Sequence, residues 1–128
     1  MIKRLFVFLA LFFSLSVSAQ ETDILDEGRV ERGLQQISQA NSNYFTNEGW
    51  SSTWMTLNAW YVDVLLNNQE AKAYLSQVIN SKDVYDRFND LNYKKQNKTI
   101  RYSEIDEFNS YLRKVIWAEI DRLYPPVQ

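Results

Sequence analysis

Apolar residues recur at helical spacing through most of this chain, most clearly near its carboxyl end. There seven apolar positions mark one face of a helix, namely Ile105, Phe108, Leu112, Val115, Ile116, Ile120 and Leu123. Ser103 is the predicted N-cap, and Pro125-Pro126 stop the helix. We expect this helix to be the central packing element.

The middle of the chain predicts three further helices joined by very short turns. The first is capped by Ser51 or Ser52 and has the apolar positions Trp54, Leu57, Tyr61, Val64 and Leu65. The second follows Asn67-Asn68 and runs from Gln69 to about Asn80. The third is capped by Ser81 or Asp83 and has the apolar positions Val84, Tyr85, Phe88 and Leu91. We expect these helices to form a chain of tight hairpins.

A first helix is predicted from Thr22 to about Ala40, with Thr22 or Asp23 as its cap. Gly28 and Gly33 each weaken it by about 1 kcal/mol relative to alanine. Residues 41–49 and 92–98 have the composition of loops, and residues 99–102 that of an extended connection. Because no strand finds a partner, the predicted fold class is all-α, a small single-domain bundle of four to five helices over residues 20–128.

The first nineteen residues have the composition of a secretory signal peptide. Lys3 and Arg4 precede an apolar run over residues 5–13, and small residues lead to a cleavage site after Ala19. A membrane-spanning helix needs about 20 apolar residues, whereas serines interrupt this run after Phe13. We therefore expect a cleaved segment over residues 1–19, a periplasmic or secreted product, and no stable membrane anchor after cleavage.

Composition limits the chemistry available to the remaining domain. The chain has neither cysteine nor histidine, so disulfides, Ser-His-Asp sites, Cys-His sites and ordinary zinc sites are excluded. Burial of its many aromatic residues must supply the stability instead. We assign no catalytic residue, metal or cofactor. The acidic positions Asp83, Asp86 and Asp90 lack the glycine and alternating ligands of a calcium loop, which favours a solvated acidic face.

Five residues are candidates for contact with a partner. Trp50 lies just outside a predicted helix, Trp60 lies beside its apolar stripe, and Lys94, Lys95 and Lys98 form a basic loop with Arg101 on an otherwise acidic protein. The alternatives are packing roles for both tryptophans and simple solvation for the lysines.

The leading hypothesis is a small helical binding protein of the bacterial envelope, which acts by protein–protein contact as an immunity protein or an inhibitor does. Two alternatives stay open: a carboxylate-based hydrolase or lyase acting on envelope polymers, and a self-associating structural or chaperone-like protein that forms a homodimer. Nucleic-acid binding is disfavoured, because the chain is acidic overall and carries an export signal.

Overall fold

The computed structural model describes residues 24–47 and 54–125, and these residues form five helices and no strand. The helices are α2 (Glu27–Thr46), α3 (Trp54–Leu65), α4 (Gln69–Ile79), α5 (Lys82–Gln96) and α6 (Tyr102–Leu123). The all-α prediction is therefore confirmed. The predicted signal peptide and Trp50 lie outside the described residues. Among the five helices, none has the length and apolar character needed to cross a membrane.

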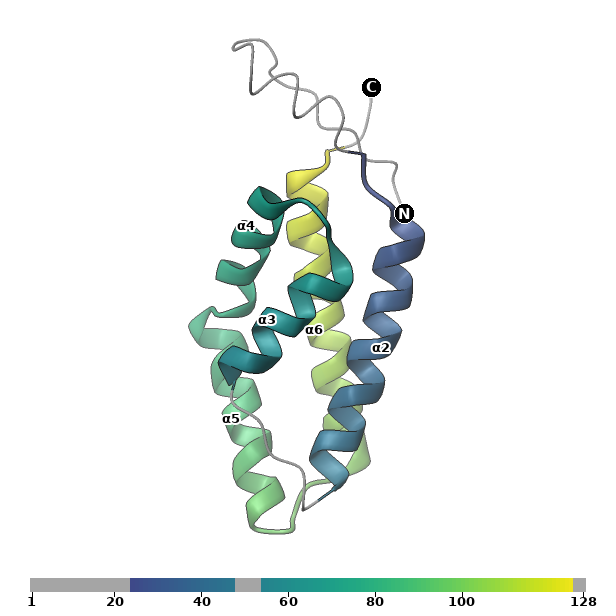
Figure 1. Ribbon diagram of the computed structural model, residues 1–128. Coiled ribbons are helices and arrows are strands. Elements are labelled where there is room, and N and C mark those ends of the chain that lie inside the picture. Colours follow the sequence, from purple (N-terminus) through teal and green to yellow (C-terminus); the bar gives the residue numbers. More distant parts are fainter. Residues whose placement is uncertain (1–23, 48–53, 126–128) are drawn as a thin grey trace.

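The helices pack around α6, as the sequence predicts. It contacts α2, α4 and α5, while α3 packs against α2 and α4 (Figure 1). One half of the bundle therefore contains four helices, and the other half contains only α2, α5 and α6. The predicted hairpin of α3 with α4 is present, but the next one is wrong: α5 continues in the general direction of α4, so that together they line one side of α6 (Figure 1).

Two predicted N-caps are confirmed. The Asn68 side chain accepts a hydrogen bond from the Ala71 backbone N–H at 2.8 Å, and the Ser81 hydroxyl accepts one from the Val84 backbone N–H at 3.4 Å. Each cap satisfies one of the amide groups that the first turn of a helix leaves without a partner. The separate cap at Ser81 starts α5 as a new helix directly after α4.

Two other predicted caps are wrong. Asp26 caps α2 instead of Thr22 or Asp23, because its carboxylate accepts a hydrogen bond from the Arg29 backbone N–H at 3.0 Å. Ser103 lies inside the first turn of α6, not before it. At that end the Glu104 carboxylate reaches back and accepts a 2.9 Å hydrogen bond from the Arg101 backbone N–H.

Two segments predicted to be loops are helical. Helix α2 continues to Thr46, because the polar stretch after Ala40 contains Tyr44 and Phe45, which are buried in the core. Asn41 is also buried, and its amide donates to Asn109 Oδ1 at 2.8 Å while its carbonyl accepts from the Tyr61 hydroxyl at 2.6 Å. Helix α5 continues to Gln96, which places two of the candidate lysines on a helix.

An aromatic cluster centred on Phe88 joins four helices. The Phe88 ring centroid lies 4.6 Å from that of Trp54, 5.8 Å from Tyr44, 5.6 Å from Phe45 and 6.4 Å from Phe108. All five side chains are buried. Such ring pairs contribute about 0.5–1.5 kcal/mol each beyond the area they bury, so this cluster holds α5 onto α2, α3 and α6.

The buried face of α3 differs in part from the prediction. Trp54, Tyr61 and Leu65 are buried as expected, but Asn58 and Val62 take the buried places that the pattern assigns to Leu57 and Val64. Leu57 and Val64 are only partly buried against the edge of the core.

Gly33 allows α2 and α3 to approach closely. A Cβ atom at this position would lie 2.8 Å from the Val64 backbone oxygen and 2.9 Å from Leu65 Cδ2, both closer than van der Waals contact permits. The sequence predicts Gly33 only as a weak point of the helix. The structure shows that the missing side chain is what lets the two helices pack.

Gly33→Ala should therefore destabilise the protein by about 1–3 kcal/mol, since the added methyl group meets backbone that cannot move without repacking α3. Gly28→Ala is the matched control. A Cβ there would meet the flexible end of the Arg32 side chain at 3.1 Å, so this change should be neutral or stabilise α2 by up to about 1 kcal/mol. Urea unfolding followed by circular dichroism measures both. Equal effects of the two changes would contradict the close approach at Gly33.

Candidate binding surface

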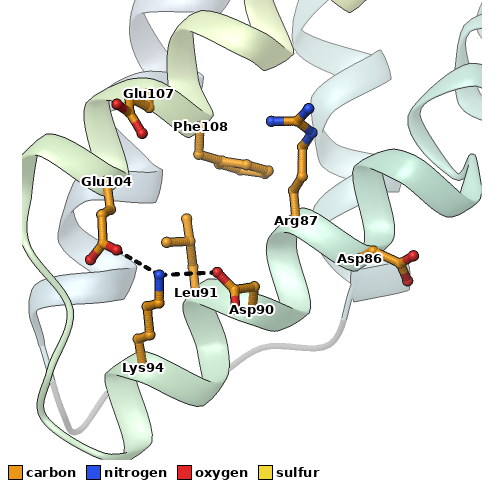
Figure 2. Close-up of a pocket in the computed structure, with 8 residues that line it drawn as sticks. All are labelled: Asp86, Arg87, Asp90, Leu91, Lys94, Glu104, Glu107 and Phe108. Carbon is orange, nitrogen blue, oxygen red and sulfur yellow. Dashed lines mark hydrogen bonds and ion pairs between the residues drawn. The ribbon is translucent and has the colours of Figure 1, made fainter.

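The groove between α5 and α6 is lined mostly by charged residues, three of which, Asp90, Lys94 and Glu104, pair with one another. Its volume is about 320 Å³, and Figure 2 shows Lys94 between two carboxylates. The Lys94 Nζ atom lies 3.2 Å from Asp90 Oδ2 on α5 and 2.6 Å from Glu104 Oε2 on α6. Lys94, a candidate partner contact, therefore ties these two helices together.

The second cation of this groove, Arg87, is also held in place. Its guanidinium carbon lies 3.8 Å from the centroid of the Tyr111 ring, and its Nε lies 3.4 Å from Asp83 Oδ2. The Tyr111 hydroxyl donates to the same Asp83 carboxylate. These contacts add a second link between α5 and α6.

Chemistry by the groove carboxylates finds little support. A general acid needs a raised pKa, whereas the hydrogen bond from Lys94 lowers the pKa of Glu104 below its ordinary value of 4.5. Within residues 24–47 and 54–125 no cluster of three or more acidic side chains is placed to hold a metal ion.

A second concavity lies where the turn between α5 and α6 meets the end of α2. We call it the basic hollow; its volume is about 240 Å³, and it is lined by Lys95, Lys98, Arg101 and Tyr102 around Phe45, Thr46, Ile100 and Ile105. Three cations thus surround a partly apolar floor, and none of the described lining residues is acidic. Tyr102 stands at the rim with 74% of its surface exposed.

Lys98 reaches the basic hollow through an unusual backbone conformation. Its φ of 59° lies in the left-handed region, and no other described residue has a positive φ. The Lys98 N–H donates to the Lys95 carbonyl at 3.1 Å, and the Thr99 N–H donates to the Lys94 carbonyl at 2.9 Å. This pair of bonds is a Schellman motif, whose left-handed position is usually glycine because a Cβ atom there costs about 1–2 kcal/mol.

Lys95 has a packing role as well as a place in the basic hollow. Its Nζ atom lies 3.9 Å from the centroid of the Tyr44 ring, and the negative end of the α5 dipole favours a cation in this last turn. At position 98, glycine would relieve the strain of the left-handed backbone. Lys98 therefore keeps a charged side chain at a position whose backbone conformation favours glycine.

The residues that the sequence offers as partner contacts do not form a single patch in the structure. Lys95 and Lys98 meet at the basic hollow, and Lys94 lies in the neighbouring groove. Trp60 lies on α3, partly buried against the core with its ring 5.9 Å from that of Tyr61. The apolar floor could not be found from sequence, because Phe45 is distant along the chain and belongs to a segment predicted to be a loop.

Comparison of this chain with protein-family models, with curated proteins and with solved structures gives no match.

The ion pair of Glu104 predicts how stability depends on pH. Because its pKa is lowered on folding, its contribution is complete above the ordinary value of 4.5 and is lost as the pH falls through the lowered value. Glu104→Gln should therefore destabilise the protein at neutral pH, and the difference from the unmodified protein should shrink towards about pH 3.

Glu107→Gln is the matched control for this prediction. Glu107 lines the same groove but has no hydrogen bond or ion pair to the other described residues, so its substitution should have little effect at either pH. Urea unfolding at several pH values measures both variants. If the effect of Glu104→Gln stays constant down to about pH 3, the ion pair does not stabilise the fold in the proposed way.

Proposed function

We propose that this protein is an exported helical binding protein of the bacterial envelope, which acts by holding an acidic segment of a protein partner in the basic hollow. The observation that carries the proposal is Lys98. It keeps a positive charge at the rim of this concavity in a conformation that glycine would adopt without strain. Residues held in such costly conformations are concentrated at functional sites.

The dimensions of the basic hollow favour one side chain over a complete substrate. Its volume of about 240 Å³ lies below the range of about 300–1,000 Å³ that is usual for small-molecule sites. Ile100, which is partly exposed above the buried Phe45 and Ile105, offers a surface for methylene groups, while the cations around it suit a carboxylate. Aspartate or glutamate from another protein matches both requirements.

The charge distribution supports the same kind of partner. The whole chain has a net charge of −2, yet three cations meet at this one place. A local positive patch on an acidic protein orients an acidic partner during encounter and disfavours other approaches. Masking of an acidic surface, as an immunity protein or an inhibitor does, needs no catalytic group from this chain.

The two alternatives have less support. A carboxylate-based hydrolase would need an acid with a raised pKa, and the Lys94 ion pair lowers the pKa of Glu104. Self-association would bring the basic hollow of one copy against an acidic surface of another, and the capture experiment below separates that case from binding to a different protein.

Charge reversal tests the surface directly. We expect the purified protein to capture a partner in stoichiometric amount from the native envelope, and the double variant Lys98→Glu/Arg101→Glu to lose that partner. Lys114→Glu, the same change at an exposed lysine of α6 outside the basic hollow, is the matched control and should retain it. Capture that survives the double reversal contradicts the proposal. Recovery of the protein alone favours self-association.

Lys98→Gly separates function from stability. The change should stabilise the fold by about 0.5–1 kcal/mol, because it removes the left-handed strain, and should weaken partner binding, because it removes the charge. Thermal unfolding and the affinity for the captured partner are measured on the same sample. Lys98→Asn, which tolerates this conformation without a charge, should also weaken binding. Unchanged affinity in both variants excludes Lys98 as a contact.

A further inference from the structure

A larger concavity lies between α2 and α6. We call it the polar seam; its volume is about 540 Å³, and its lining residues are Leu34, Gln35, Ser38, Gln39, Ser42, Asp106, Asn109, Ser110 and Arg113. Helices α2 and α6 lie side by side here (Figure 1).

The lining residues of the basic hollow and of the polar seam follow one another along the same faces of α2 and α6. On α6, Tyr102 of the basic hollow is followed at helical spacing by Asp106, Asn109 and Arg113 of the polar seam. Steps of four, three and four residues keep all four positions on one helix face. On α2, Thr46 of the basic hollow follows Gln35, Gln39 and Ser42 of the polar seam with the same steps. A ligand anchored in the basic hollow therefore meets the polar seam next.

The polar seam carries hydrogen-bonding groups that the fold does not use. The side chains of Gln35, Ser38, Ser42 and Ser110 make no hydrogen bond to the other described residues. An amide side chain offers a donor and an acceptor together, as a peptide group does, and a hydroxyl can serve as either. Such a lining suits the backbone of an extended peptide, whose N–H and C=O groups have no partner of their own.

The charge of the lining residues changes along the polar seam, from the end near the basic hollow to the end at Arg113. Arg113 donates to both Glu31 carboxylate oxygens, at 2.7 and 2.8 Å, so its charge is compensated at the far end. Asp106, next to the basic hollow, has no ion pair with a described residue. The surface therefore presents positive charge in the basic hollow, negative charge at Asp106, and uncharged groups beyond.

The spacing of these charges along α6 predicts the spacing of complementary charges on a bound peptide. The four residues from Tyr102 to Asp106 span about 6 Å along α6, which two residues of an extended chain also span. Side chains two residues apart on an extended chain point to the same side. An acidic residue beside Tyr102 in the basic hollow thus places the residue two positions away from it over Asp106.

The geometry points to an extended segment of the partner, about five residues long, that lies along the polar seam with an acidic residue in the basic hollow, a basic residue two positions away over Asp106, and uncharged residues beyond. This inference rests on the proposed function, since the acidic residue is the same anchor. It adds the conformation, the length and the charge order of the partner.

Two pairs of fluorescent hexapeptides test the charge order in both chain directions. One pair is Glu-Ser-Lys-Ser-Gly-Ser and its charge-exchanged form Lys-Ser-Glu-Ser-Gly-Ser; the other is Ser-Gly-Ser-Lys-Ser-Glu and Ser-Gly-Ser-Glu-Ser-Lys. Fluorescence anisotropy with the purified protein gives each affinity. We expect the acidic-end member of one pair to bind about tenfold more tightly than its exchanged form, a difference of about 1.4 kcal/mol.

Variants then assign the contacts. Asp106→Lys should remove the preference for lysine and favour Glu-Ser-Glu-Ser-Gly-Ser, or its reverse-order counterpart, instead. Ser110→Trp should fill the polar seam and weaken the preferred peptide about tenfold. Lys114→Trp, an exposed position of the same helix outside the polar seam, is the control and should have no effect. Circular dichroism of each variant checks that the fold is intact.

The outcomes separate this inference from the proposed function. If Lys98→Glu/Arg101→Glu abolishes partner capture while neither Asp106→Lys nor Ser110→Trp alters peptide binding, the polar seam is not a contact and the proposed function survives. Failure of all four peptides to bind at millimolar concentration, or equal binding within both pairs, also overturns the inference. Capture that survives the double reversal rejects both proposals.

Discussion

The packing of aromatic rings around Phe88 is the constraint on which the rest of this structure depends. With no cysteine, the chain has no covalent link between its helices, and residues from α2, α3 and α6 meet the same ring of α5. The cluster fixes the position of α5 in the half of the bundle that has only three helices. Both the charged groove and the basic hollow involve α5, so their geometry depends on these ring contacts.

Local signals in the sequence were sufficient for part of this fold. Asn68 and Ser81 act as caps through hydrogen bonds that reach only three residues, and the apolar spacing of α6 describes its own buried face. The second half of α2 could not be found in this way. Asn41 has loop character by itself, and its burial depends on Tyr61 and Asn109, which lie 20 and 68 residues further along the chain.

The same distinction applies to the candidate surface. A run of lysines predicted a basic patch, but not that Lys94 turns to Glu104 whereas Lys95 and Lys98 border a hollow. That division depends on which side of α5 faces α6, and the extension of α5 through a predicted loop decides it. The apolar floor had no sequence signal either, since Phe45 and Ile105 meet only because the end of α2 lies beside the start of α6.

The hydrogen bonds from Tyr61 to Asn41 and from Asn41 to Asn109 have a direction. Burial raises the pKa of the Tyr61 hydroxyl, so this group keeps its proton and donates it to the Asn41 carbonyl. Asn41 must then turn its NH₂ group outward, where it occupies the carbonyl oxygen of Asn109. The Asn109 NH₂ group donates in turn to the Ser38 carbonyl oxygen at 3.4 Å, which ties the side chain back to α2. A phenol in the core thus sets the direction of a chain of hydrogen bonds that runs through Asn41 and Asn109 to the backbone of α2, and the orientation of a side chain at the polar seam is fixed from inside the protein.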